Sequence, residues 1–140
     1  MTDAKPALTL ADAKDILRST AFAVDLGYDV TEVGRGTATV ELRPNSRHLR
    51  PGDMVAGPIL MGLADLAFWI AAQSVIGREL MVLTLEEKTA FLSPARGTVR
   101  SEARVLKSGR RVVYGEATTF DATDQAVAHH TLTYLRADGG

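Results

Sequence analysis

Hydrophobic and polar residues alternate with a period of two in several stretches of the chain, a pattern typical of β-strands with one buried face. In the clearest stretch, Ala38, Val40 and Leu42 fall on one side of the strand and the polar residues between them fall on the other. Arginine-proline, serine-glycine and aspartate-rich turn sequences separate such stretches. The strands predicted in this way cover residues 26–33, 37–42, 80–92, 98–106, 112–120 and 126–135.

A long helix is predicted over residues 58–76. Gly57-Pro58 marks its start, because proline is favoured at the first helical position, and Gly77 marks its end. Between these glycines the only charged residue is Asp65, so the helix is apolar on every side and is expected to be buried within protein. A membrane span of this length is the alternative, but an interior carboxylate is costly in hydrocarbon, so no membrane association is expected.

The order of the predicted elements indicates the fold. A short amphipathic helix over residues 10–19 precedes two strands, the buried helix and four more strands. Strands joined by short turns pair antiparallel, and a curved antiparallel sheet around the helix would cover its apolar sides. We therefore expect an α+β fold forming one domain over residues 1–140, with residues 1–20 as an N-terminal extension. Such a sheet leaves one side of the helix open, which predicts a homodimer.

The composition excludes several functions. The 140 residues include no cysteine, which excludes disulfides, thiolate metal sites and cysteine nucleophiles. A formal net charge of −1 gives no general attraction to nucleic acid, and no nucleic-acid partner is expected. The first residues lack the charged-then-apolar layout of a secretory signal, so a cytoplasmic location is expected.

Asp65 is the first candidate for catalysis. A carboxylate on an otherwise uncharged helix must be hydrogen-bonded or must face a polar cleft. A general base or nucleophile fits this position, and so does a buried aspartate that ties down a loop through backbone N–H groups. The sequence alone leaves both roles open.

The start of the long helix is the second candidate. The first backbone N–H groups of a helix have no partner within it, and Gly57 would let a ligand approach them closely. That arrangement suits the carbonyl oxygen of a thioester as it becomes an oxyanion. An ordinary turn into a helix explains Gly57-Pro58 equally simply.

The histidines and arginines give weaker signals. His129 and His130 are adjacent in a predicted strand and so face opposite sides of the sheet, whereas His48 lies in the loop before the helix, where it could reach a cleft. No histidine stands at a metal-ligand spacing from another, and no metal site is predicted. Arg43 and Arg50 belong to an arginine-rich loop that suits either a phosphorylated ligand or solvent.

Three motifs resemble a known family when taken together and in order. Residues 54–65 are similar to the "HGG…LAD" helix of the PaaI-type hotdog thioesterases. Residues 89–97 are similar to that family's strand ending in "FLrPa…G", and residues 107–110 are similar to its hairpin turn. Each motif is weak alone, but their order is specific, and the resemblance covers nearly the whole chain after Leu26.

The resemblance implies a hotdog fold and an acyl-CoA thioesterase that releases the free acid and CoA. It implies that Asp65 is the general base or nucleophile and that the Gly57 N–H polarises the thioester carbonyl. The active site would be shared across the interface of a dimer or a dimer of dimers. Coenzyme A would be bound as part of the substrate, so no separate cofactor is expected.

Four positions near these two residues are expected to contact the substrate: Arg50, Ala56, Pro58 and Met61. Three of them depart from the family pattern. Ala56 stands where a histidine is usual, Pro58 replaces the second glycine, and Arg50 lies about where a loop asparagine often assists the water.

Two other functions are left open by these departures. A non-catalytic hotdog protein that binds acyl-CoA would explain the loss of the helper histidine, although the retained Asp65 argues against it. A hotdog hydratase or dehydratase would need a histidine and a carboxylate at one cleft, and no histidine stands at the start of the helix.

Overall fold

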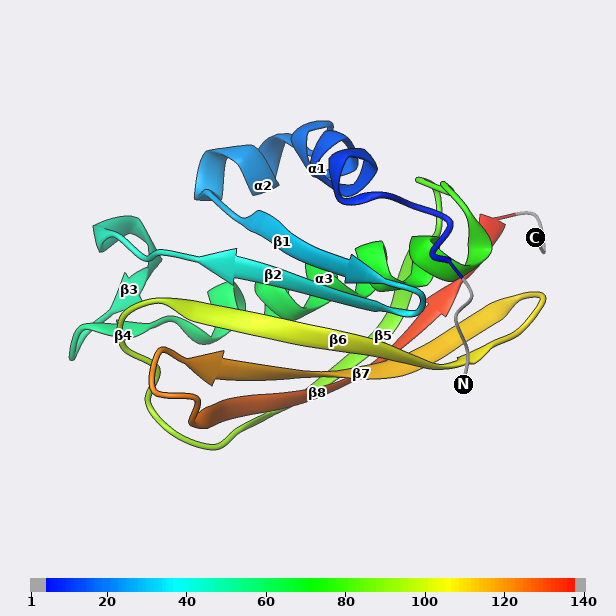
Figure 1. The fold of residues 1–140 in the computed structure, drawn as a ribbon. Coiled ribbons are helices and arrows are strands. Elements are labelled where there is room, and N and C mark those ends of the chain that lie inside the picture. The colour runs from blue at the N-terminus through cyan, green and yellow to red at the C-terminus, as the bar shows by residue number, and fades with distance from the viewer. Residues whose placement is uncertain (1–4, 138–140) are drawn as a thin grey trace.

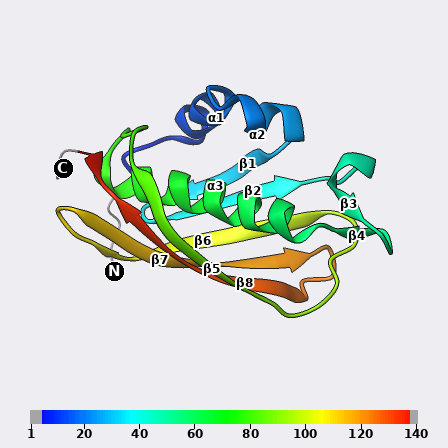
Figure 2. The same ribbon diagram turned by 180° about the vertical axis from the view of Figure 1, so that it is seen from behind.

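The computed structural model describes residues 5–137 and shows a six-stranded antiparallel sheet curved around one long helix, α3 (Gly57–Ile76) (Figures 1 and 2). The strands are hydrogen-bonded in the order β1-β2-β6-β7-β8-β5. This arrangement confirms the predicted hotdog fold and its α+β class. The strands are β1 (Asp29–Gly34), β2 (Thr37–Leu42), β5 (Leu83–Phe91), β6 (Val99–Ser108), β7 (Val112–Asp121) and β8 (Ala126–Leu135).

The place of β5 differs from the expectation that consecutive strands pair. β5 pairs with β8, and β6 pairs with β2. The connection between β5 and β6, residues 92–98, is too long for a two-residue hairpin and contains Pro94. It therefore does not fold β6 back to pair with β5. As a result β5 is an edge strand beside α3 (Figure 2).

Two helices precede the sheet and lie beside β1 (Figure 1). The predicted helix is confirmed as α1 (Leu10–Arg18). The second, α2 (Ala21–Leu26), was not predicted, and the first strand therefore begins three residues later than expected. Gly27 ends α2 in the left-handed conformation with φ of 84°, which is a common glycine stop.

The loop before α3 is more regular than the sequence indicated. It forms a 3-10 turn, η1 (Ser46–His48), followed by a hairpin of β3 (Leu49–Arg50) and β4 (Met54–Val55). The hairpin lies at the end of the molecule where α3 begins (Figure 1).

The helix α3 packs tightly on the concave face of the sheet. The ring of Phe68 lies against Gly115 of β7, where the Cβ of any other residue would overlap the ring. The same ring meets that of Tyr134 edge-on, with the two ring centroids 4.8 Å apart. The length and hydropathy of α3 would suit a membrane span, yet 61% of its most apolar 18-residue stretch is buried within the protein. Its apolar character is thus explained by its place in the core.

Candidate active site

Asp65 is held in position by two strands. Thr84 at the start of β5 donates a hydrogen bond to Asp65 Oδ1 at 2.8 Å. The Tyr134 hydroxyl on β8 lies 2.6 Å from the same Oδ1 and 2.6 Å from the Asp65 carbonyl oxygen. Within residues 5–137 no group donates to Oδ2. One carboxylate oxygen is therefore fixed by donors while the other is left for a ligand or a water molecule.

Tyr134 is suited to be a permanent donor. Its side chain is buried, and burial together with the neighbouring Asp65 carboxylate raises the pKa of Tyr134 well above its usual value. The hydroxyl thus keeps its proton. The period-two pattern places Tyr134 on the inner face of its strand, but only the sheet order brings it and Thr84 to the same carboxylate.

Asp65 lies at a cleft of about 470 Å³ between α2, α3 and the start of β5. Gly57 lies at another cleft, of about 550 Å³, between the β3–β4 hairpin and the end of β5. Arg50 lines this second cleft together with Gly57, and Phe91 and Leu92 form its apolar wall.

The Gly57 N–H is the free donor at the start of α3. Ile59 and Leu60 both donate to the Ala56 carbonyl oxygen, at 3.0 and 3.2 Å, and Pro58 has no N–H. No acceptor for the Gly57 N–H is found in the described part of the chain. The amide is therefore available to a ligand oxygen, as the oxyanion hypothesis requires.

The other predicted substrate contacts are less clearly placed. Ala56 is half-buried, and its N–H donates to the His48 carbonyl oxygen at 2.9 Å. Pro58 is exposed and Met61 half-buried, and neither lines the two clefts. Because Met61 lies one helical turn from Asp65, it shares that face of α3.

One chain does not bring Gly57 and Asp65 together. They are eight residues apart on the same helix, which corresponds to about 12 Å along the axis. A nucleophile and an oxyanion donor must both lie about 3 Å from one reacting carbonyl group. The two groups of a single chain are therefore too far apart to act on the same carbonyl.

His48 is a structural residue, which corrects the suggestion that it might reach a cleft. It is 2% exposed, its Nδ1 accepts from the Asn45 N–H at 2.9 Å, and its Nε2 donates to the Leu26 carbonyl oxygen at 2.6 Å. Both ring nitrogens are used to fasten the loop before α3. Across residues 5–137, no three His, Asp or Glu side chains are grouped to hold a metal ion.

A buried polar cluster under α3 was missed in the sequence. As predicted, His129 and His130 face opposite sides of the sheet, with His130 fully buried. Its ring nitrogens lie 2.8 Å from the hydroxyls of Thr89 and Thr119, and its Nδ1 lies 3.5 Å from Glu87 Oε2. Since both nitrogens are already engaged, His130 is not free for the acid–base role that a hydratase would need.

Glu87 is the member of this cluster whose charge is poorly paired. Its side chain is 10% exposed, and its Oε2 is buried without a hydrogen bond. Burial raises the pKa of Glu87, and the nearby Asp65 carboxylate adds to the rise, while His130 opposes it. A carboxyl group whose pKa is raised by folding stabilises the protein at low pH and loses that contribution as the pH rises through its folded-state pKa.

We expect Glu87→Gln to stabilise the fold at neutral pH by about 1 kcal/mol, because it removes a buried, poorly paired charge. The gain over wild type should grow as the pH rises and vanish at acidic pH, which thermal unfolding over a pH series measures. Glu86→Gln is the matched control, since Glu86 is exposed on the other face of β5. A Glu87→Gln variant less stable than wild type at pH 7 would contradict the expectation.

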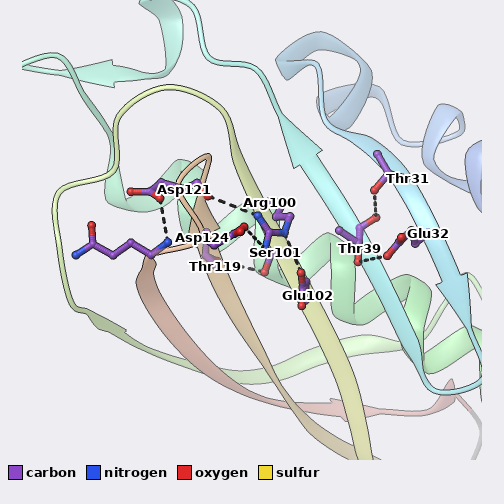
Figure 3. Close-up of polar contacts among 10 residues, drawn as sticks. Thr31, Glu32, Thr39, Arg100, Ser101, Glu102, Thr119, Asp121 and Asp124 are labelled. Carbon is purple, nitrogen blue, oxygen red and sulfur yellow. Dashed lines mark hydrogen bonds and ion pairs between the residues drawn. The ribbon is translucent and has the colours of Figure 1, made fainter.

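The outer face of the sheet carries charges that pair with one another (Figure 3). Arg100 pairs with Glu102 at 2.8 Å and with Asp124 at 2.9 Å, and Arg104 pairs with Glu116 at 2.6 Å. A groove of about 410 Å³ runs over these strands. Because it lies on the side of the sheet away from α3, it is separate from Asp65.

The fold and the sequence agree on the class of protein. Residues 52–128, more than half of the chain, match the thioesterase superfamily. A conserved protein of known structure from Pseudomonas aeruginosa is 30% identical, with a TM-score of 0.81 over 89% of this chain and 98% of that one. The chain belongs to the thioesterase superfamily.

Two more solved structures share the hotdog fold. The PaaI protein of the E. coli phenylacetic acid degradation operon has a TM-score of 0.82 at 24% identity, over 92% of this chain and 93% of its own. Zebrafish thioesterase superfamily member 2 has a TM-score of 0.83 at 20% identity, over 93% of this chain and 99% of its own. The resemblance to the PaaI-type proteins inferred from the motifs is thereby confirmed.

Proposed function

We propose that this protein hydrolyses acyl-CoA thioesters to the free acid and CoA. The observation that carries the proposal is the Asp65 carboxylate, with Oδ1 held by Thr84 and Tyr134 and Oδ2 left open at a cleft. A carboxylate oriented in this way can take a proton from an attacking water molecule. Membership of the thioesterase superfamily supports a thioester as the bond that is cleaved.

The proposed reaction uses two groups of the protein. The water oxygen bonds to the thioester carbon as its proton passes to Asp65 Oδ2, and the carbonyl oxygen becomes an oxyanion that accepts from the Gly57 N–H. The C–S bond then breaks, the oxyanion returns to a carbonyl, and the proton held by Asp65 passes to the CoA thiolate, which restores the Asp65 carboxylate. Direct attack by Asp65 would instead form a mixed anhydride, which ¹⁸O incorporation into the enzyme during a single turnover in labelled water would reveal.

This reaction needs a second copy of the chain, because Gly57 and Asp65 of one chain are too far apart. The edge strand β5 joins the two clefts and offers a surface for that copy: Leu83, Leu85 and Phe91 are 61%, 62% and 54% exposed. Exposed apolar side chains on an unpaired edge are typical of a strand that meets a partner. We infer a homodimer or a dimer of dimers with Asp65 from one chain facing Gly57 from the other.

The proposed function is tested with a panel of acyl-CoA thioesters and a free-thiol readout. The expected result is release of CoA from at least one member, slowed at least about 100-fold in Asp65→Asn. Binding of acyl-CoA without any release would favour the non-catalytic alternative, to which Ala56 in place of the usual histidine gives some support.

Arg50→Ala is expected to raise KM about tenfold with little change in kcat, because a cation at the rim of the Gly57 cleft would bind the phosphates of CoA equally in the ground and transition states. Steady-state kinetics measures both parameters. Arg43→Ala is the control, since the Arg43 side chain is 85% exposed and lies outside the cleft. Unchanged kinetics in Arg50→Ala would mean that Arg50 is only a surface charge.

A further inference from the structure

Glu87 points to the same face of the sheet as the two groups that hold Asp65. In the pairing of β5 with β8, Thr84 is opposite Tyr134. Glu87 is opposite Leu132, two residues away from Tyr134 on β8, and both of these β8 side chains are buried in the core. Because two residues of a strand span about 7 Å, Glu87 lies in the row of side chains next to the row that binds Asp65 Oδ1.

The hydrogen bonds of His130 leave the Glu87 carboxyl group without a donor. Thr119 donates its hydroxyl proton to Ser101 at 3.2 Å, so the Thr119 oxygen accepts from His130 Nε2 at 2.8 Å. In the neutral ring Nδ1 then has no proton, and it accepts from the Thr89 hydroxyl at 2.8 Å. Glu87 Oε2 lies 3.5 Å from this Nδ1, and no group in the described part of the chain donates to it.

The groups that face Glu87 include a second carboxylate. Asp65 faces it from α3, and His130 and the Tyr134 hydroxyl face it from β8. No lysine or arginine of residues 5–137 forms an ion pair with Glu87. Burial and the Asp65 carboxylate both raise the pKa of Glu87. Repulsion between two carboxylates is mutual, so each of them holds a proton more tightly while the other is ionised.

We propose that Glu87 is a positioning residue that acts through Asp65: its carboxylate, in the neighbouring row, makes Asp65 a stronger base toward the attacking water. The proposal rests on the proposed thioester hydrolysis, in which Asp65 accepts a proton from water. That proton removes the repulsion between the two carboxylates, which favours the transfer. Glu87 itself neither contacts the substrate nor passes on the proton.

This role also explains why a poorly paired carboxyl group is kept in the core. A buried charge without a hydrogen bond lowers stability, and such groups persist in native proteins where function needs them. Glu87→Gln should therefore have opposite effects on the two properties: a fold at least as stable as wild type and a slower reaction.

The test is the dependence of kcat/KM on pH, measured with the best thioester of the acyl-CoA panel. In Glu87→Gln the acidic midpoint of the profile should move down by about one pH unit, because a nearby negative charge is removed. The plateau should fall about threefold to tenfold, because a weaker base accepts the proton less readily. Glu87→Asp keeps the charge and should keep a midpoint near that of wild type. Glu86→Gln is the control, since Glu86 is exposed on the other face of β5.

A merely structural role would lower the rate at every pH without moving the midpoint. An unchanged or raised midpoint in an active Glu87→Gln protein would overturn the proposal, whatever happens to the plateau.

Carbon-13 NMR of the carboxyl groups separates this proposal from the proposed function. In Asp65→Asn the midpoint of the Glu87 titration should fall, because the repelling charge is gone. If wild type cleaves no thioester but this shift is seen, the hydrolysis is wrong and the coupling of the two carboxyl groups stands. A Glu87 titration that does not move in Asp65→Asn would overturn the coupling, even if the wild-type protein is an active thioesterase.

Discussion

Asp65→Asn is expected to lower kcat by about 10²–10⁴-fold, the usual contribution of a positioned general base. The amide oxygen can still accept from Thr84 and Tyr134, as Asp65 Oδ1 does, so the packing around it should survive. The group that replaces Oδ2 can no longer accept a proton or attack a carbonyl carbon. The melting temperature should therefore equal or exceed that of wild type.

Stopped assays for free thiol give the rate, and thermal unfolding gives the stability. Asp25→Asn serves as the matched substitution, because Asp25 is exposed on α2 away from the cleft. An Asp65→Asn protein that hydrolyses its best thioester within a few-fold of wild type would end the catalytic assignment. Lost activity together with a lower melting temperature would assign Asp65 a structural role instead.

Gly57→Pro is expected to lower kcat by about 10²–10³-fold, because it deletes the one free N–H at the start of α3. Proline is favoured in the first helical turn, and the preceding Ala56 has the extended conformation that a following proline requires, with ψ of 143°. Because residue 57 itself precedes Pro58, which disfavours the helical conformation of a residue with a Cβ, circular dichroism of the variant checks that α3 still forms.

Gly57→Ala is the control for the added carbon atoms. A Cβ at this position would come 3.2 Å from the ring of Phe91, which is 54% exposed and can move aside. Alanine keeps the N–H, so most of the activity should be retained. Equal losses in the two variants would show that the space beside Gly57, and not its N–H, matters.

Mixing the two inactive proteins tests the shared site. If Asp65 of one chain acts with Gly57 of the other, a mixed dimer of Asp65→Asn and Gly57→Pro chains contains one intact site and one doubly altered site. With random exchange, half of the dimers are mixed, and activity should return to about a quarter of the wild-type value. A mixture as inactive as its parents, with light scattering showing that dimers have exchanged, would mean that each site lies within one chain.

Local patterns in the sequence were sufficient for much of the fold. Period-two alternation in some stretches, together with the turn sequences between them, identified the six strands of the sheet, because burial of one strand face produces that alternation whatever the neighbouring strand is. Gly57-Pro58 and Gly77 placed the ends of α3 correctly, since both act on the backbone within one turn of the helix. Asp65 could be recognised as a candidate because no other charge lies on that helix.

Short or non-repeating segments were beyond such patterns. The six residues of α2 are too few to display a helical period, and its end depends on the left-handed conformation of Gly27. The wall that Phe22 contributes to the Asp65 cleft was therefore not foreseen. Its place follows from the packing of α2 beside α3 and the start of β5.

The surroundings of Asp65 were decided by tertiary structure alone. Thr84 and Tyr134 lie fifty residues apart in sequence and meet at one carboxylate only because β5 pairs with β8 instead of with the next strand along the chain. The same pairing brings Glu87 beside His130. The sequence by itself determined the six strands of the sheet, α1 and α3, and it singled out Asp65 and Gly57, because these depend on local backbone preferences and on burial. The side chains that contact Asp65 and the shapes of the two clefts depend on the order of the strands. That order is set by how the whole sheet curves around α3.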